Sequence, residues 1–158
     1  MSKGFFESIG AVIPGYSGYA ERDGRRKTDK LLRMELVKIL GRGKDNISAL
    51  IRGNVKSTGL DNIRSLNNIK DDISRTMDKI LYAQYGASGF FDVVQIDENR
   101  LDEIYLQDIK IQEVCIELVS FISDCKDTIE NECENRIQNK IKRIEVLMIE
   151  RERIIKEI

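Results

Sequence analysis

Histidine and tryptophan are both absent from this chain of 158 residues. Without histidine, the sequence lacks the commonest general base near neutral pH and the commonest zinc ligand. Aromatic residues make up only 6% of the chain and there is one proline, whereas charged residues make up 34%. This balance is typical of long helices and coiled coils rather than of sandwiches or wound α/β sheets. We therefore expect a single helical domain, residues 1–158, that is not an enzyme and has no cofactor or metal.

Cysteine is scarce: the chain has only Cys115, Cys125 and Cys133. An odd number argues against a disulfide framework and favours reduced cysteines that serve as small apolar residues. If Cys125 and Cys133 share one helix they are about 12 Å apart along its axis, which is too far for a disulfide. Residues 1–19 have no signal-peptide pattern, and no stretch approaches the length of a membrane span. We therefore predict a cytoplasmic protein.

Glycine and proline are missing from the whole of residues 90–158, a stretch of 69 residues. Apolar residues recur there at intervals of three or four, which indicates either one very long helix or two helices with little to mark the break. We predict one long coiled-coil-like helix over residues 97–158. Between Ile129 and Ile141 the steps are all of four residues, a stutter that unwinds a left-handed supercoil. We expect the helix to straighten or to change partner there.

The remainder of the chain divides into four segments. Residues 1–19 form an amphipathic segment followed by a turn, 21–56 a basic helix, 61–85 a second helix, and 86–96 a joint. The apolar stripe of the basic helix stays in phase across Gly41 and Gly43, which favours a continuous helix, although a break after Leu40 remains an alternative. Short connections make successive helices antiparallel neighbours. The predicted fold is an all-α, elongated antiparallel bundle of about three main helices with a long C-terminal helix.

A helix of this length cannot bury its apolar stripe within one small domain, so we expect self-association. The most probable function on this reasoning is a non-enzymatic scaffold or adaptor that forms homo-oligomers through coiled-coil-type packing and contacts a protein partner. The residues assigned to the contact between copies are Leu118, Ile122, Ile129, Ile137, Ile141, Ile144 and Met148.

Charge is distributed unevenly along the chain. Residues 1–60 hold 12 basic and 6 acidic residues, whereas residues 89–134 hold 3 basic and 13 acidic residues. The simplest interpretation is that the basic helix lies against the acidic half of the long helix. The alternative is a basic face that contacts a nucleic acid, an anionic lipid surface or another anion. Such a face would use Arg22, Arg25, Arg26, Lys27, Lys30 and Arg33. Nucleic acid is the weaker of these alternatives, because no aromatic residues interleave with the bases.

Residues 13–33 are the most motif-like part of the sequence, with one proline, three glycines, two tyrosines and a basic run. The structural interpretation is a corner at the end of the bundle, shaped by Pro14 and the glycines. The functional interpretation is a surface that docks a partner or inserts peripherally into a membrane. The residues assigned to that contact are Phe5, Phe6, Ile9, Ile13, Tyr16 and Tyr19.

Overall fold

The computed structural model describes residues 2–54, 59–83, 89–125 and 131–158, and all side chains within these ranges except those of residues 2, 3, 5, 6 and 54. The described residues form helices and contain no β-strand, which confirms the predicted all-α class. The elements are α1 (Ser2–Gly10), α2 (Arg22–Asn54), α3 (Leu60–Tyr82), the 3-10 helix η1 (Gly89–Phe91), α4 (Glu98–Asp124) and α5 (Asn131–Lys156).

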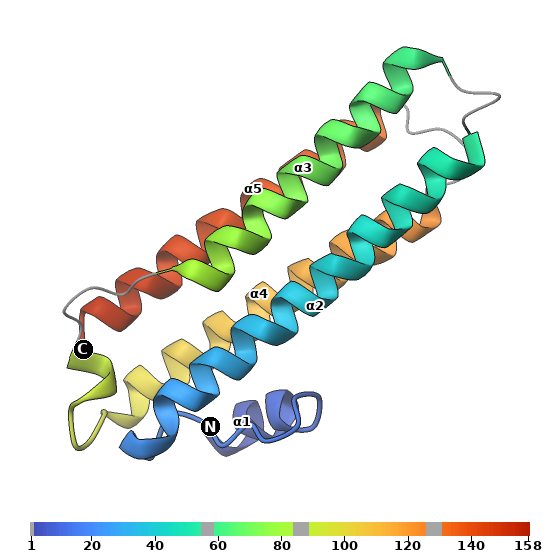
Figure 1. Ribbon diagram of the computed structural model, residues 1–158. Coiled ribbons are helices and arrows are strands. Elements are labelled where there is room, and N and C mark those ends of the chain that lie inside the picture. The colour runs from blue at the N-terminus through green and yellow to red at the C-terminus, as the bar shows by residue number, and fades with distance from the viewer. Residues whose placement is uncertain (1, 55–58, 84–88, 126–130) are drawn as a thin grey trace.

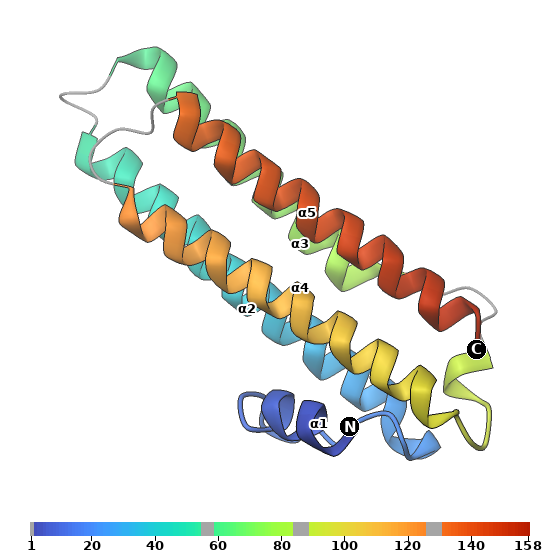
Figure 2. The same ribbon diagram turned by 180° about the vertical axis from the view of Figure 1, so that it is seen from behind.

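The four long helices run side by side along the molecule as two antiparallel hairpins, α2–α3 and α4–α5 (Figures 1 and 2). α2 packs against α3 and α4, and α5 packs against the same two helices. Each of these helices is therefore at a corner of the bundle, with α2 diagonal to α5 and α3 diagonal to α4. The short α1 packs on the outside of α4.

The predicted single helix over residues 97–158 is wrong. α4 ends at Asp124, and its C-cap, Cys125, has an extended backbone with φ −69° and ψ 117°. α5 begins at Asn131 and returns along α4. The physical reason is burial: folding back lets the apolar stripes of both halves cover each other and the α2–α3 hairpin, whereas a straight rod would leave them in water. Within the described ranges the bundle consequently has four long helices rather than about three.

α2 is continuous through Gly41 and Gly43, as the phase of its stripe predicted. A Cβ atom at Gly43 would lie 3.3 Å from Val119 Cγ2 and 3.6 Å from Ile122 Cδ1, both on α4. Gly41 is less crowded, because its nearest neighbour would be Met77 Cε at 3.9 Å. Gly43 therefore marks the place where α2 and α4 approach each other closely.

The apolar core extends along the bundle, and one end of it is closed by aromatic residues. Tyr19 is fully buried between Phe90, Tyr105 and Tyr16, with ring centroids 5.4 Å, 5.4 Å and 6.1 Å away. Phe90 belongs to η1 in the joint between α3 and α4, so this joint and the N-terminal segment meet at the same end. The aromatic residues seal the end where the hairpins meet.

Candidate functional site

Two left-handed glycines shape the segment that leads from α1 into α2. Gly15 has φ +79° and Gly18 has φ +76°, a region that residues with a side chain rarely adopt. Ser17 Oγ lies 3.2 Å from Thr28 Oγ1, within hydrogen-bonding distance. A Cβ atom at Gly24 would lie only 3.0 Å from Ser17 Oγ, so the turn sits closely on the first turn of α2. The motif-like residues 13–33 thus form a packed corner.

A buried ionic cluster lies behind this corner, centred on Arg151 of α5. The Arg151 guanidinium donates to Asp108 of α4 at 2.5 Å and to the Tyr19 hydroxyl at 2.9 Å, and it pairs with Asp29 of α2 at 2.9 Å. Tyr19 in turn donates to Asp108 at 2.7 Å, and Arg33 pairs with Asp29 at 2.9 Å. Arg151 therefore reaches through the centre of the bundle and joins α5 to both α4 and its diagonal neighbour α2.

Burial changes the acid–base properties of this cluster. Burial raises the pKa of Asp108, while the neighbouring Arg151 opposes this effect. Burial also raises the pKa of Tyr19, and the Asp108 carboxylate raises it further. Tyr19 therefore remains a neutral hydrogen-bond donor at neutral pH. Such a cluster specifies which helices meet, and it is inaccessible to a ligand because Arg151, Tyr19 and Asp108 are all fully buried.

Arg25 also has a structural role, at the end of the bundle where the corner and the joint between α3 and α4 meet. Its guanidinium donates to four backbone carbonyls, those of Tyr19 at 2.7 Å, Ala20 at 3.2 Å, Phe90 at 2.9 Å and Val93 at 2.6 Å. These carbonyls belong to the corner and to the joint between α3 and α4. Arg25 thereby fastens two irregular segments to α2, because each segment presents carbonyl groups that its own backbone leaves unpaired.

The six basic residues assigned to anion contact separate into two groups. Arg25 and Arg33 are buried, and Arg33 donates to the Ala83 carbonyl at 2.7 Å in addition to its pairing with Asp29. Their assignment to a surface is therefore corrected. The others are exposed at the start of α2, and they are Arg22, Arg26, Lys27 and Lys30.

The residues assigned to docking or to a membrane are mostly inside the protein. Ile9 and Tyr19 are fully buried, and Ile13 and Tyr16 are nearly so. α1 packs against α4, and because all four side chains are buried, they are not available to a partner or a membrane in this conformation. Phe5 and Phe6 fall outside the described side chains. No helix in the described ranges combines the length and the apolar content needed to cross a bilayer.

The residues assigned to contact between copies also lie in the interior of the single chain. Leu118, Ile122, Ile137, Ile141 and Ile144 are buried in the core between α4, α5 and their neighbours. In addition, Met148 is partly buried, and Ile129 lies outside the described residues. These residues were assigned to an interface because the apolar stripe of a single long helix would be too long to bury. Since α5 returns along α4, the stripe is buried within one chain and the assignment no longer has a basis.

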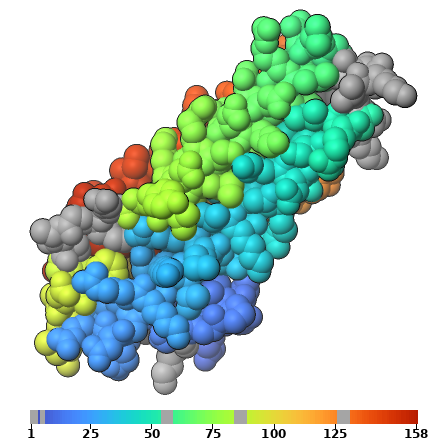
Figure 3. Space-filling model, viewed as in Figure 1, coloured from blue at the N-terminus to red at the C-terminus, as the bar shows by residue number. Residues whose placement is uncertain are grey.

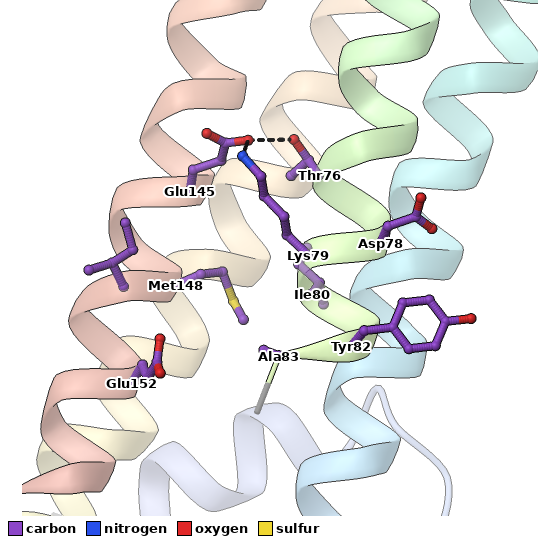
Figure 4. Close-up of a pocket in the computed structure, with 10 residues that line it drawn as sticks. Thr76, Asp78, Lys79, Ile80, Tyr82, Ala83, Glu145, Met148 and Glu152 are labelled. Carbon is purple, nitrogen blue, oxygen red and sulfur yellow. Dashed lines mark hydrogen bonds and ion pairs between the residues drawn. The ribbon is translucent and has the colours of Figure 1, made fainter. Parts of the chain in front are cut away.

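An open apolar groove of about 420 Å³ lies between the C-terminal halves of α3 and α5 (Figure 4). Met148 points into it from α5, and Ile149, 67% exposed, stands beside it. Its charged lining consists of Lys79 with Asp78, Glu145 and Glu152, so the formal charge is −2. Lys79 and Thr76 both donate to Glu145, at 2.8 Å and 3.2 Å. We call this feature the acidic groove.

A second groove lies on the other side of α3, against the start of α2. Its charged lining consists of Arg26, Lys30 and Arg33 with Asp29, so the formal charge is +2. Leu81, Tyr82 and Phe91 supply its apolar lining, and Arg26 stacks over the Phe91 ring with its guanidinium carbon 4.7 Å from the centroid. Figure 3 shows this face, with α2 in blue to cyan beside α3 in green. We call this feature the basic groove.

Tyr82 borders both grooves and is 72% exposed. It stands on the outer side of α3, with Asp78 one turn before it (Figure 4). A large exposed aromatic side chain between two apolar grooves of opposite charge is the arrangement expected at a contact with another protein. Among the described residues there is no group of three or more metal-ligating side chains.

No protein-family model, curated protein or solved structure matches the chain. The functional interpretation therefore depends on the two grooves and on the buried cluster that holds their helices in place.

Sequence reasoning missed Asp108 and Arg151, although the sequence contains a signal for both. Asp108 occupies the seam position between Ile104 and Ile111, and Arg151 falls in the gap between Met148 and Ile155. A charged residue at a position where the helical repeat requires an apolar one indicates a buried partner of opposite charge. Tyr82 carried no comparable signal, because its exposure depends on how α3 is rotated against α2 and α5.

Proposed function

We propose that the protein is a non-enzymatic helical scaffold or adaptor that self-associates through the surface around Tyr82. The observation that carries this proposal is the separation of charge on the two sides of α3, −2 in the acidic groove and +2 in the basic groove. A surface whose two sides carry equal and opposite charge complements a second copy of itself. Contact of this kind replaces the coiled-coil seam predicted from the sequence.

The direction of the symmetry axis follows from where the charges lie. A two-fold axis parallel to α3 places the acidic groove of each copy against the basic groove of the other, which gives two identical attractive contacts. A two-fold axis perpendicular to α3 within the contact plane would instead oppose acidic to acidic and basic to basic. The proposed dimer therefore has its α3 helices parallel and Tyr82 near the axis, where an aromatic residue contributes most to affinity.

Charge reversal tests this arrangement. Lys30→Glu lowers the charge of the basic groove from +2 to 0, and Glu152→Lys raises that of the acidic groove from −2 to 0. Each variant therefore loses the charge attraction at both contacts and should have the mass of one chain in light scattering where the wild type has the mass of two. Mixing the two variants restores the attraction between a −2 groove and a +2 groove at one of the two contacts, so the mixture should recover the mass of two chains. Lys27→Glu is the matched control, because Lys27 is exposed on the same helix and lines neither groove.

Two results would overturn the proposal. One is a wild-type chain that remains monomeric at the highest concentration at which it is soluble. The other is a dimer whose mass is unchanged in both charge-reversal variants. Circular dichroism of each variant establishes that it is folded, because surface substitutions of this kind change stability by only about 0.5 kcal/mol.

A second candidate function is contact with an anion through the exposed bases of α2. Lys27 and Lys30 are exposed and have no acidic partner within the part of the chain that the structure describes. In this case Lys27→Glu and Lys30→Glu should weaken salt-sensitive binding to anionic vesicles or to heparin equally. Under the dimer proposal only Lys30→Glu affects the mass in solution.

A further inference from the structure

The break between α4 and α5 brings two cysteines to the same turn of the bundle. Cys125 is the C-cap of α4, where its backbone N–H donates to the Ile122 carbonyl at 3.2 Å. Cys133 is the third residue of α5, which runs back along α4. Both side chains are partly buried and pack against the same apolar core. The separation of about 12 Å expected within one continuous helix therefore does not apply.

Contacts on both sides of the turn show that these chain ends lie together. The Arg136 guanidinium carbon lies 4.5 Å from the centroid of the Phe121 ring, which joins the last turn of α4 to the first turns of α5. The Cys125 thiol donates to the Phe121 carbonyl at 3.2 Å. Burial raises the pKa of Cys125, and the neighbouring Cys133 thiol raises it further.

Cys125 is also accessible from solvent. Cys125 lines an open cavity of about 440 Å³ between the ends of α2 and α4, together with Asn46, Leu50 and Gly53. A small disulfide reagent can enter a cavity of this size. Cys115 differs, because it is fully buried in the core and burial raises its pKa to about 12. Cys125 is thus an accessible thiol, Cys133 is a partly buried one, and Cys115 is an inert thiol that serves as an internal reference.

We propose that Cys125 and Cys133 form a reversible intramolecular disulfide by exchange with a low-molecular-weight disulfide such as oxidised glutathione. One cysteine thiolate attacks a sulfur of the reagent, and the S–S bond of the reagent breaks to release one glutathione thiolate. The second cysteine thiolate then attacks the protein sulfur of this mixed disulfide and releases the second glutathione. Two protein thiols are oxidised, one reagent disulfide is reduced to two thiols, and the two protons leave with the released thiols.

The bond would close a loop of nine residues, counted from Cys125 to Cys133, across the α4–α5 turn. It would link the end of α4 to the start of α5 without involving Tyr82 or either groove. The modification is therefore independent of the proposed self-association, and the two can fail separately.

Incubation of the native protein with oxidised glutathione, followed by mass spectrometry without reduction, tests the proposal. The expected product has lost two hydrogen atoms, retains one free thiol, and yields a peptide that links Cys125 to Cys133. Cys125→Ser and Cys133→Ser should each retain one bound glutathione and form no internal link. Below the thiol pKa, the reaction rate should rise about tenfold per pH unit, because the thiolate is the attacking species.

Three outcomes would overturn the proposal. Glutathione that remains bound to wild-type Cys125 or Cys133 would mean that the second thiol does not reach the first. A link that involves Cys115 would mean that the reaction proceeds through an unfolded chain. Thiols that react in urea but not in the native protein would mean that the pair is inaccessible. Reduction of the expected product should return all three thiols, and its urea midpoint should be higher before reduction than after it.

Discussion

Replacement of Arg151 by leucine should have one of the largest effects of any single substitution in this protein. The side chain is fully buried and contacts Asp108, Asp29 and Tyr19. Without it, Asp108 loses its only cation among the described residues, whereas Asp29 keeps Arg33 at 2.9 Å. Removal of one partner from a buried ion pair costs about 3–5 kcal/mol, because the remaining charge is left without compensation. We expect the free energy of unfolding of Arg151→Leu to fall by about 4 kcal/mol.

A second substitution distinguishes the energetic cost of the uncompensated Asp108 charge from the cost of the lost Arg151 packing. Asp108→Asn removes the carboxylate that Arg151 neutralises but keeps a side chain of similar shape. In the double variant Arg151→Leu/Asp108→Asn no uncompensated charge remains at residue 108, so its loss of stability should be smaller than the sum of the two single losses. Contacting residues of this kind have coupling energies of about 0.5–3 kcal/mol, and we expect a value in the upper part of that range.

The effect of Arg151→Leu should also depend on pH. Burial raises the pKa of Asp108 while Arg151 opposes the rise, so removing Arg151 raises this pKa further. A carboxyl group with a raised pKa binds its proton more tightly in the folded state than in the unfolded state. Its contribution to stability is therefore greatest at low pH and is lost as pH rises from about 4 toward the folded-state pKa. The destabilisation caused by Arg151→Leu should be smaller near pH 4 than at pH 7.

Urea unfolding followed by circular dichroism measures these free energies. Arg143→Leu is the matched control, because Arg143 is exposed on the same helix, and this variant should stay within about 0.5 kcal/mol of the wild type. A loss below about 1 kcal/mol for Arg151→Leu would refute the reasoning, because it would fall below the cost of leaving a charge buried. Strict additivity of the two substitutions, or a penalty that grows as pH falls, would refute it as well.

Four further substitutions test the corner and the helix contacts by the same unfolding assay. Tyr19→Phe removes the hydroxyl that donates to Asp108, and it should cost about 1–3 kcal/mol because a buried acceptor loses a partner. Gly18→Ala places a Cβ atom on a residue with φ +76°, and it should cost about 1–2 kcal/mol, as a left-handed backbone does for residues with a side chain. Gly41→Ala should stabilise α2 by about 0.5–1 kcal/mol, because its Cβ has room, whereas Gly43→Val should destabilise the protein because of its contacts with α4.

The helical class and the course of α2 could be predicted from the sequence because both depend on local periodicity. The stripe through Leu36, Leu40 and Ile47 requires only that one face of a helix be apolar, and its continuity across two glycines predicted one helix. α2 and α4 approach each other closely at Gly43, where a Cβ atom would lie 3.3 Å from Val119 Cγ2.

The break at Cys125 was missed because no glycine or proline marks it. The stutter between Ile129 and Ile141 lies directly beside the break, but a change of phase is equally compatible with a straight helix that changes partner. Tertiary packing decides between a straight helix and a broken one. The return of α5 along α4 buries residues such as Ile137 and Ile144 that a straight helix would expose. The two grooves could not be predicted for the same reason, since they depend on which helices become neighbours.

The hydrogen bonds of Arg25 and Arg151 also determine which parts of the molecule unfold together. The bond from Arg151 to Tyr19 joins residues 132 positions apart, and Arg25 fastens the joint near Phe90 to the same corner. Irregular segments ordinarily exchange their amide hydrogens early, through local fraying. Here the corner is released only when α5 separates from α2 and α4, so its amides should exchange together with those of the core helices. Slow exchange at Tyr19 would thus report the docking of a helix more than a hundred residues further along the chain.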